Sequence, residues 1–287
     1  MPEEPNVIQV MFRVSPLSLA LGAVLLWSLL AMLAVRLAHV PPFLLLALSL
    51  GGAALLGSPG WRRWRVAPAT MVLGVYGLFG FHLLLFLALR RAPAVEANLI
   101  NYLWPLLIVV LAPVLLPGTR LAGRHIVAVV FGLAGAALLI SGGRFTFASQ
   151  YWAGYALAAG SAFVWATYSL LTRRVAPFPT AAVGLFCLLS GALALACHVL
   201  LEPAYTPTRA DVAWIVLLAI GPMGAAFFLW DAALKRGDPR TIGALAYLTP
   251  LGSTLWLVAS GAGSLTPVSA GAALLIVGGA ALGAARR

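Results

Sequence analysis

Ten apolar stretches, each about as long as a bilayer core is thick, dominate the sequence. A helix needs about 20 apolar residues to cross the hydrocarbon core, where only helices and closed barrels can satisfy their backbone groups. We therefore predict an all-α integral membrane protein whose connections are too short to hold a soluble domain. The predicted spans are 15–37, 41–57, 68–90, 94–116, 124–142, 151–173, 178–201, 211–236, 241–262 and 267–285.

The composition excludes two other classes of protein. Hydrophobic residues make up 62% of the chain and charged residues only 9%, against roughly 45–50% and about 25% in soluble domains. This argues against a soluble enzyme. The net charge of +11 is typical of nucleic-acid-binding proteins too, but the basic residues are scattered among short loops and form no basic helix face. We therefore expect no nucleic-acid partner.

The basic residues also predict the orientation of the chain, because cytoplasmic loops carry an excess of Lys and Arg. With the N-terminus inside, 13 basic residues fall on the inner side and five on the outer side, so both termini are predicted to be cytoplasmic. The five outer residues are Arg36, Arg90, Arg91, Arg144 and Arg209.

The chain repeats itself near its midpoint. Residues 88–106, ALRRAPAVEANLINYLWPL, match residues 233–251, ALKRGDPRTIGALAYLTPL, at seven of 19 positions with an offset of 145. GAALLISGG at 135–143 likewise matches GAALLIVGG at 271–279. We predict two repeats of five helices, 15–142 and 151–285. Since five is odd, the second repeat enters the membrane inverted, as in many secondary transporters with a site near the midplane.

The stretch NLINYLWPLL at 98–107 is polar and aromatic inside an apolar run. Asn98, Asn101, Tyr102 and Pro105 share one helix face, with Trp104 at its edge. Unpaired amides are costly against lipid, so this face is predicted to line a cavity and bind a ligand. The alternative is that the asparagines join helices and the proline is an ordinary kink. In the second repeat, Tyr247 and Pro250 occupy the positions of Tyr102 and Pro105.

Two further helix faces are candidates for the same cavity. Trp165, Tyr168 and Ser169 lie on one face of the sixth span, although its hydroxyl groups also suit bonds within the helix. His82, deep in the third span, is a functional candidate because ionisable groups are rare inside membranes. It either titrates there or is neutral and bonded to a neighbouring helix.

The sequence gives no sign of catalysis or of a cofactor. Its seven carboxylates form no pair close enough for acid–base chemistry, and no nucleophile motif or phosphate-binding loop is present. No Cys/His cluster has the spacing of metal ligands. We expect no enzyme activity, no metal and no cofactor. A receptor or structural role stays possible, but inverted halves favour transport.

Several of these motifs together resemble the EamA-type members of the drug/metabolite transporter superfamily. The resemblance rests on the tryptophan in the first helix of each half, Trp27 and Trp165, on NYLWPL and AYLTPL, and on the two GAALLI runs. WSLLAMLAVR at 27–36 and ANLINYLWPLL at 97–107 look most like the YddG-type amino-acid exporters. The chain departs from many members in having Ser28 after Trp27, and it lacks the membrane glutamate of the smaller multidrug relatives.

The resemblance implies a fold and an activity. It implies ten helices around a central cavity, whose wall would include His82, Tyr102, Trp104 and Trp165. It implies export of aromatic and other neutral amino acids across the bacterial inner membrane by alternating access. Export of aromatic cations, drugs or other small metabolites is the rival expectation. We expect a monomer in the lipid bilayer that lets its substrate run down its own gradient, since no carboxylate chain leads protons to His82.

Overall fold

The structure, a computed structural model, describes residues 14–144, 147–261 and 264–285, whose regular segments are all helices. Proline stands in the first turn of several helices, where its missing N–H needs no partner. The α-helices are α2 (Pro16–Ser28), α3 (Leu30–Arg36), α4 (Pro42–Gly57), α5 (Pro68–Val75), α6 (Phe81–Leu89), α7 (Ala94–Asn101), α8 (Trp104–Leu115), α9 (Gly123–Ser141), α10 (Trp152–Leu171), α11 (Val183–Leu201), α12 (Arg209–Ile220), α13 (Ala226–Arg236), α14 (Pro239–Leu245), α15 (Leu248–Ala259) and α16 (Pro267–Ala284).

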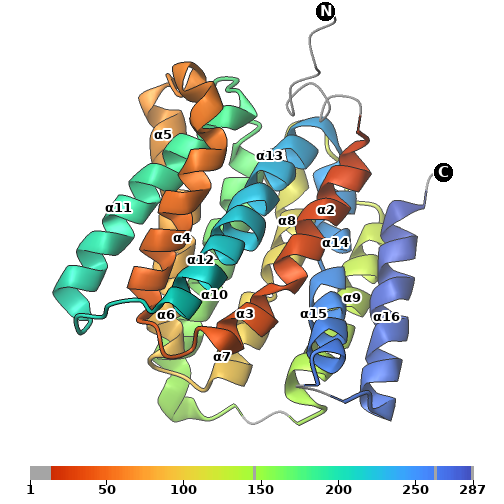
Figure 1. Ribbon diagram of the computed structural model, residues 1–287. Coiled ribbons are helices and arrows are strands. Elements are labelled where there is room, and N and C mark those ends of the chain that lie inside the picture. Colours follow the sequence, from red (N-terminus) through yellow and green to blue (C-terminus); the bar gives the residue numbers. More distant parts are fainter. Residues whose placement is uncertain (1–13, 145–146, 262–263, 286–287) are drawn as a thin grey trace, which may run out of the picture.

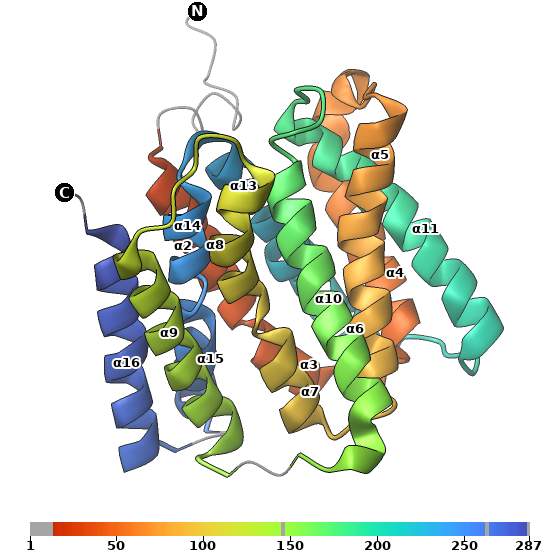
Figure 2. The ribbon, with the colours of Figure 1, turned by 180° about the vertical axis from the view of Figure 1, so that it is seen from behind.

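Nine of the ten predicted spans are confirmed as helices long and apolar enough to cross a membrane, within the described residues. The predicted sixth span coincides with α10, a helix of 20 residues that carries several Trp, Tyr, Ser and Thr side chains. These side chains make it less apolar than the others, and it lies beside α6 on the face of the molecule that is seen in Figure 2. The chain is a multi-pass membrane protein.

The helices stand roughly parallel, and segments far apart in the sequence pack side by side. Helix α9 pairs with α16, and α4 pairs with α11 (Figures 1 and 2). Small residues allow the close approach of α9 and α16, because a Cβ on Gly135 would lie 2.6 Å from the side chain of Ile276. Helix α2 begins and α16 ends at the same end of the bundle, which we call the terminal end (Figure 1). We call the opposite end the distal end.

Five spans are interrupted. The first span breaks at Leu29, and the fourth and ninth break at residues 102–103 and 246–247, just before Pro105 and Pro250. Because proline has no N–H, the carbonyl four residues before it loses its helical partner. The third and eighth spans contain π-helical turns, η2 (Tyr76–Gly80) and η5 (Gly221–Ala225). The offset between these turns is again 145, so the two halves interrupt their third helices at the same place.

Candidate functional site

A cavity of about 630 Å³ opens between helices of both halves. It runs from Trp27, Trp104 and Trp165 near the middle of the bundle to Leu89 and Ile140, near the distal ends of α6 and α9. No Asp, Glu, Lys or Arg is among the residues that line it. Its size falls within the range of roughly 300–1,000 Å³ typical of small-molecule sites. The polar or titratable residues in its wall are Ser49, His82, Asn98, Asn101, Tyr102, Thr249, Ser253 and Thr254.

Three indole rings from three different spans form the floor of the cavity. The ring centre of Trp27 lies 6.1 Å from that of Trp104 and 5.9 Å from that of Trp165, with the planes nearly perpendicular. Trp27 Nε1 donates to the carbonyl oxygen of Pro222 at 3.1 Å, in the π turn η5. Edge-to-face contacts of this kind favour a fixed arrangement. The floor is therefore a rigid aromatic layer that separates the cavity from the terminal end.

The predicted face of α7 borders the cavity. Asn98, Asn101 and Tyr102 all belong to its wall. Asn101 also joins two helices, because its Oδ1 lies 3.1 Å from the hydroxyl of Ser161 on α10. The same Ser161 hydroxyl lies 3.0 Å from the carbonyl oxygen of Phe81. Asn101 therefore does both things that were considered for this stripe: it lines the cavity, and it contacts a neighbouring helix.

His82 lines the cavity between aromatic rings, and one of its ring nitrogens is already bonded. Its Nδ1 lies 2.6 Å from the carbonyl oxygen of Leu78, in the π turn η2. A carbonyl oxygen only accepts, so Nδ1 carries the proton. The rings of Phe81, Phe86 and Phe227 surround the imidazole, with centres 4.9–6.3 Å away. A neutral ring in this place leaves Nε2 as an acceptor for a ligand.

Four of the predicted site residues do not line the cavity. Tyr168 packs against Gly77, where a Cβ would lie 2.2 Å from its ring, and Ser169 accepts a hydrogen bond from Trp230 Nε1 at 3.1 Å. Tyr247 is fully buried, and its hydroxyl donates to the carbonyl oxygen of Tyr102, its own counterpart in the first repeat, at 3.1 Å. Pro105 is buried too, whereas Pro250 lines the cavity.

Sequence reasoning missed other parts of the wall. Ser49 and Thr249 line the cavity, and their hydroxyl groups have no hydrogen-bond partner among the described residues. Ser49 carries no signal in the sequence, since a single serine in an apolar run is equally typical of helix packing. Thr249 could have been found, because it occupies the position of Trp104 in the repeat.

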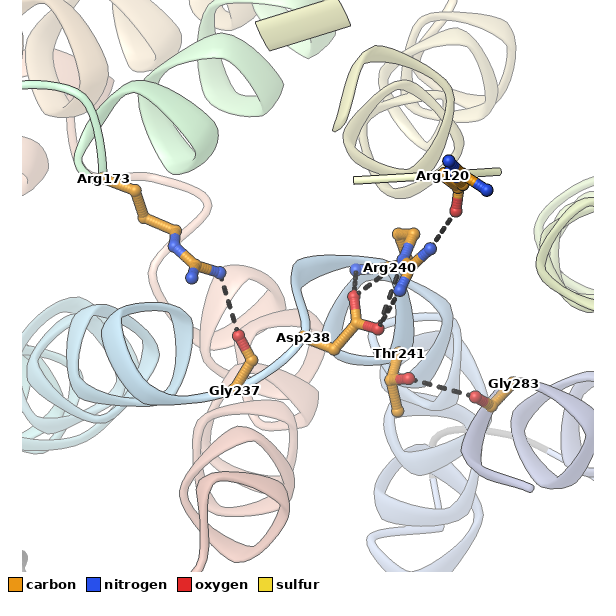
Figure 3. A network of polar contacts seen from close by, with 7 residues as sticks. All are labelled: Arg120, Arg173, Gly237, Asp238, Arg240, Thr241 and Gly283. Atoms are coloured by element: carbon orange, nitrogen blue, oxygen red, sulfur yellow. Dashed lines mark hydrogen bonds and ion pairs between the residues drawn. The ribbon is translucent and has the colours of Figure 1, made fainter. Parts of the chain in front are cut away.

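Hydrogen bonds between loops and helix ends close the terminal end (Figure 3). Arg173 Nη1 donates to the Gly237 carbonyl oxygen at 3.1 Å, and Thr241 donates to that of Gly283 at 3.1 Å. Arg240 donates to the carbonyl oxygen of Arg120 and forms an ion pair with Asp238. Burial raises the pKa of the Asp238 carboxyl, but the hydrogen bonds from Arg240 outweigh it and hold the pKa below its usual value. None of the residues in this network lines the cavity, whereas the lining extends to residues near the distal end.

Comparisons with known proteins agree with this architecture. The model of the EamA-like transporter family matches residues 14–141 and 152–284. The chain is 43% identical to an aromatic amino acid exporter YddG of Ancylobacter novellus over 95% of this chain and 98% of that protein. It is 28% identical to an aromatic amino acid exporter YddG of Salmonella typhimurium, over 72% of this chain and 74% of that one.

A solved crystal structure shares the fold. It superposes with a TM-score of 0.89 at 43% sequence identity, covering 93% of this chain and 95% of the other. The match of the family model to both halves agrees with the repeat found in the sequence. The chain belongs to the EamA-like transporter family.

Proposed function

We propose that the protein exports aromatic and other neutral amino acids across the bacterial inner membrane by alternating access. The observation that carries this proposal is the cavity, which has indole walls and hydrogen-bonding groups but no Asp, Glu, Lys or Arg in its lining. A zwitterion has no net charge, so dipoles and neutral hydrogen-bonding groups suit it better than a fixed ion. The relatives named as aromatic amino acid exporters support the same substrate class.

The proposed topology has ten spans in two inverted repeats, with α10 as the sixth span. The equal offset of the π turns η2 and η5 supports the repeat, as do the breaks before Pro105 and Pro250. The described loops and helix ends carry ten basic residues at the terminal end and five at the distal end, which supports a cytoplasmic terminal end. The ten are Arg62, Arg63, Arg65, Arg120, Arg124, Arg173, Arg174, Lys235, Arg236 and Arg240.

With this orientation, the cavity opens to the outside and the structure is an outward-facing state. Export then requires a second state, in which the bonds of the terminal end break and the distal end closes. The interruptions of five spans are places where helices can bend between the two states. Because no carboxylate lines the cavity and His82 Nδ1 is bonded to Leu78, we infer that the substrate moves down its own gradient without a proton.

The groups of an amino acid match the groups of the cavity. The ammonium can donate to His82 Nε2 and stack on an indole by cation–π contact. Amide and hydroxyl groups such as those of Asn98 and Ser253 can donate to the carboxylate. The apolar side chain fits against Trp104 and Trp165. Aromatic cations would share the cation–π contact, but they would find no carboxylate in the wall.

Counterflow into proteoliposomes tests the proposed function. Vesicles preloaded with unlabelled tryptophan should accumulate labelled tryptophan, phenylalanine and threonine well above protein-free vesicles. A labelled quaternary aromatic cation should stay near the protein-free level, because the wall offers it no counter-charge. Accumulation of the cation without any amino acid would overturn the proposal in favour of drug export.

His82 should contribute to affinity for the ammonium. Replacing His82 by Leu removes the acceptor, and a hydrogen bond to a charged group contributes about 1.5–3 kcal/mol, so KM for tryptophan should rise at least about 10-fold. The matched control is His125→Leu, since His125 is also buried, on α9, but does not line the cavity. Equal KM values for His82→Leu and the unaltered protein would reduce His82 to a packing role.

A further inference from the structure

Thr249 has an unusual environment for a transmembrane threonine. The residue is only 6% exposed, and its hydroxyl has no hydrogen-bond partner among the described residues. Other threonines of the bundle bond back to their own helix: Thr254 donates to the Pro250 carbonyl oxygen at 3.0 Å and Thr167 to that of Phe163 at 2.7 Å. A buried hydroxyl without a partner is destabilising unless something else supplies the bond.

Thr249 lies directly after the break in the ninth span. Residues 246–247 interrupt the helix there, and the backbone N–H of Thr249 donates to the Ala246 carbonyl oxygen at 3.0 Å. Thr249 lies in the first turn of α15, among the residues that line the cavity, and its hydroxyl oxygen is buried in the absence of a ligand. The hydroxyl is therefore an unpaired donor beside the site, and contact with a ligand requires rotation of the side chain.

Thr249 differs chemically from Trp104, the residue at the corresponding position of the first repeat. Trp104 and Thr249 occupy corresponding positions, each two residues after a tyrosine and one before a proline, and both line the cavity. One half thus contributes an indole and the other a hydroxyl at the same point of the fold. An amino acid has the same division, with an apolar side chain at one end and a carboxylate at the other.

We propose that the Thr249 hydroxyl donates a hydrogen bond to the carboxylate of the transported amino acid, whose side chain then packs toward Trp104. This inference rests on the proposed function. It assigns the two ends of the substrate to the two halves of the protein. No covalent step is involved, and the bond exists only while substrate occupies the cavity.

The test compares variants of the full chain in proteoliposomes by the KM for tryptophan counterflow. Thr249→Val keeps the shape and removes the hydroxyl, so its KM should rise about 10-fold with the maximal rate within about twofold. Thr249→Ser keeps the hydroxyl and should stay within about twofold of the unaltered KM. If Thr249→Val does not yield folded protein, Thr249→Ala removes the same hydroxyl and should give the same rise.

The matched control is Thr70→Val. Thr70 on α5 is 1% exposed and its hydroxyl also lacks a partner among the described residues, but it does not line the cavity. Its KM should be unchanged. An unchanged KM in Thr249→Val, or an equal rise in Thr70→Val, would overturn the assignment.

A ligand without a carboxylate separates binding from general damage. 3-Methylindole, a neutral indole without a carboxylate, should inhibit tryptophan counterflow with the same inhibition constant in the unaltered protein and in Thr249→Val, because it lacks the group that the hydroxyl contacts. An equal loss of 3-methylindole and tryptophan binding would contradict the proposal. Absence of any tryptophan counterflow in the unaltered protein would instead reject the proposed function, so the two failures are distinguishable.

Discussion

Replacing Trp104 by Ala should reduce tryptophan counterflow about 100-fold while the protein stays folded in detergent. Trp104 is 7% exposed, and its ring centre lies 5.6 Å from that of Trp230 and 6.1 Å from that of Trp27. Truncating a tryptophan at a binding hot spot typically costs at least about 2 kcal/mol of interaction with the ligand, and about 2.7 kcal/mol corresponds to 100-fold in rate. The variant loses the floor of the cavity and the surface against which we place the substrate side chain.

A second tryptophan provides the control for this experiment. Trp152 begins α10 and is 70% exposed, so Trp152→Ala removes the same side chain without altering the cavity. Its transport should match that of the unaltered protein. Size-exclusion profiles and melting temperatures of both variants report on folding. Wild-type flux in a well-folded Trp104→Ala variant would remove this residue from the site.

A disulfide between α8 and α14 should abolish transport reversibly. A Cβ on Gly243 would lie 3.4 Å from the Cβ of Ile108, close to the 3.5–4.5 Å separation found in disulfides. Both residues lie between the aromatic floor and the terminal end, and they come from different repeats. In the proposed cycle these helices separate when the terminal end opens. The double variant Ile108→Cys/Gly243→Cys should therefore transport when reduced and lose transport to background when oxidised.

The native cysteines, Cys187 and Cys197, are free thiols and should first be replaced by Ala. Each single cysteine variant, treated with the same oxidant, controls for oxidation elsewhere. Formation of the bond is followed by mass spectrometry, and a reductant should restore the flux. Full transport by protein that is quantitatively crosslinked would show that the terminal end opens along some other pair of helices.

The spans were predictable because the bilayer imposes a simple rule on the sequence. A helix in lipid must be about 20 residues long and apolar, so its length appears directly in the hydropathy pattern. The π turns η2 and η5 could not be predicted in this way. They arise from packing between helices: Gly77 in η2 sits against the ring of Tyr168, and Pro222 in η5 exposes a carbonyl that Trp27 uses. Glycines occur in both turns and η5 also contains Pro222, but these residues do not specify the geometry of the turns.

The candidate site was only partly predictable, because it too depends on how the helices pack against one another. Helical periodicity identifies which face of a span turns inward, but it does not say at which end the cavity is open. Tyr102 and Tyr247 occupy the same position in the two repeats, yet Tyr102 lines the cavity and Tyr247 is buried against Gly132 on α9. The depth of a residue and the state of the protein decide between these outcomes, and neither appears in a single sequence.

The unequal residues at positions 104 and 249 have a stereochemical consequence. An indole, a hydroxyl and the imidazole of His82 surround the same chamber, and no two of them offer the same chemistry. Three different fixed contacts around one tetrahedral carbon distinguish it from its mirror image. The divergence of two copies of one unit has in this way given one chamber three distinct contacts, so the L and D forms of a substrate should not fit alike.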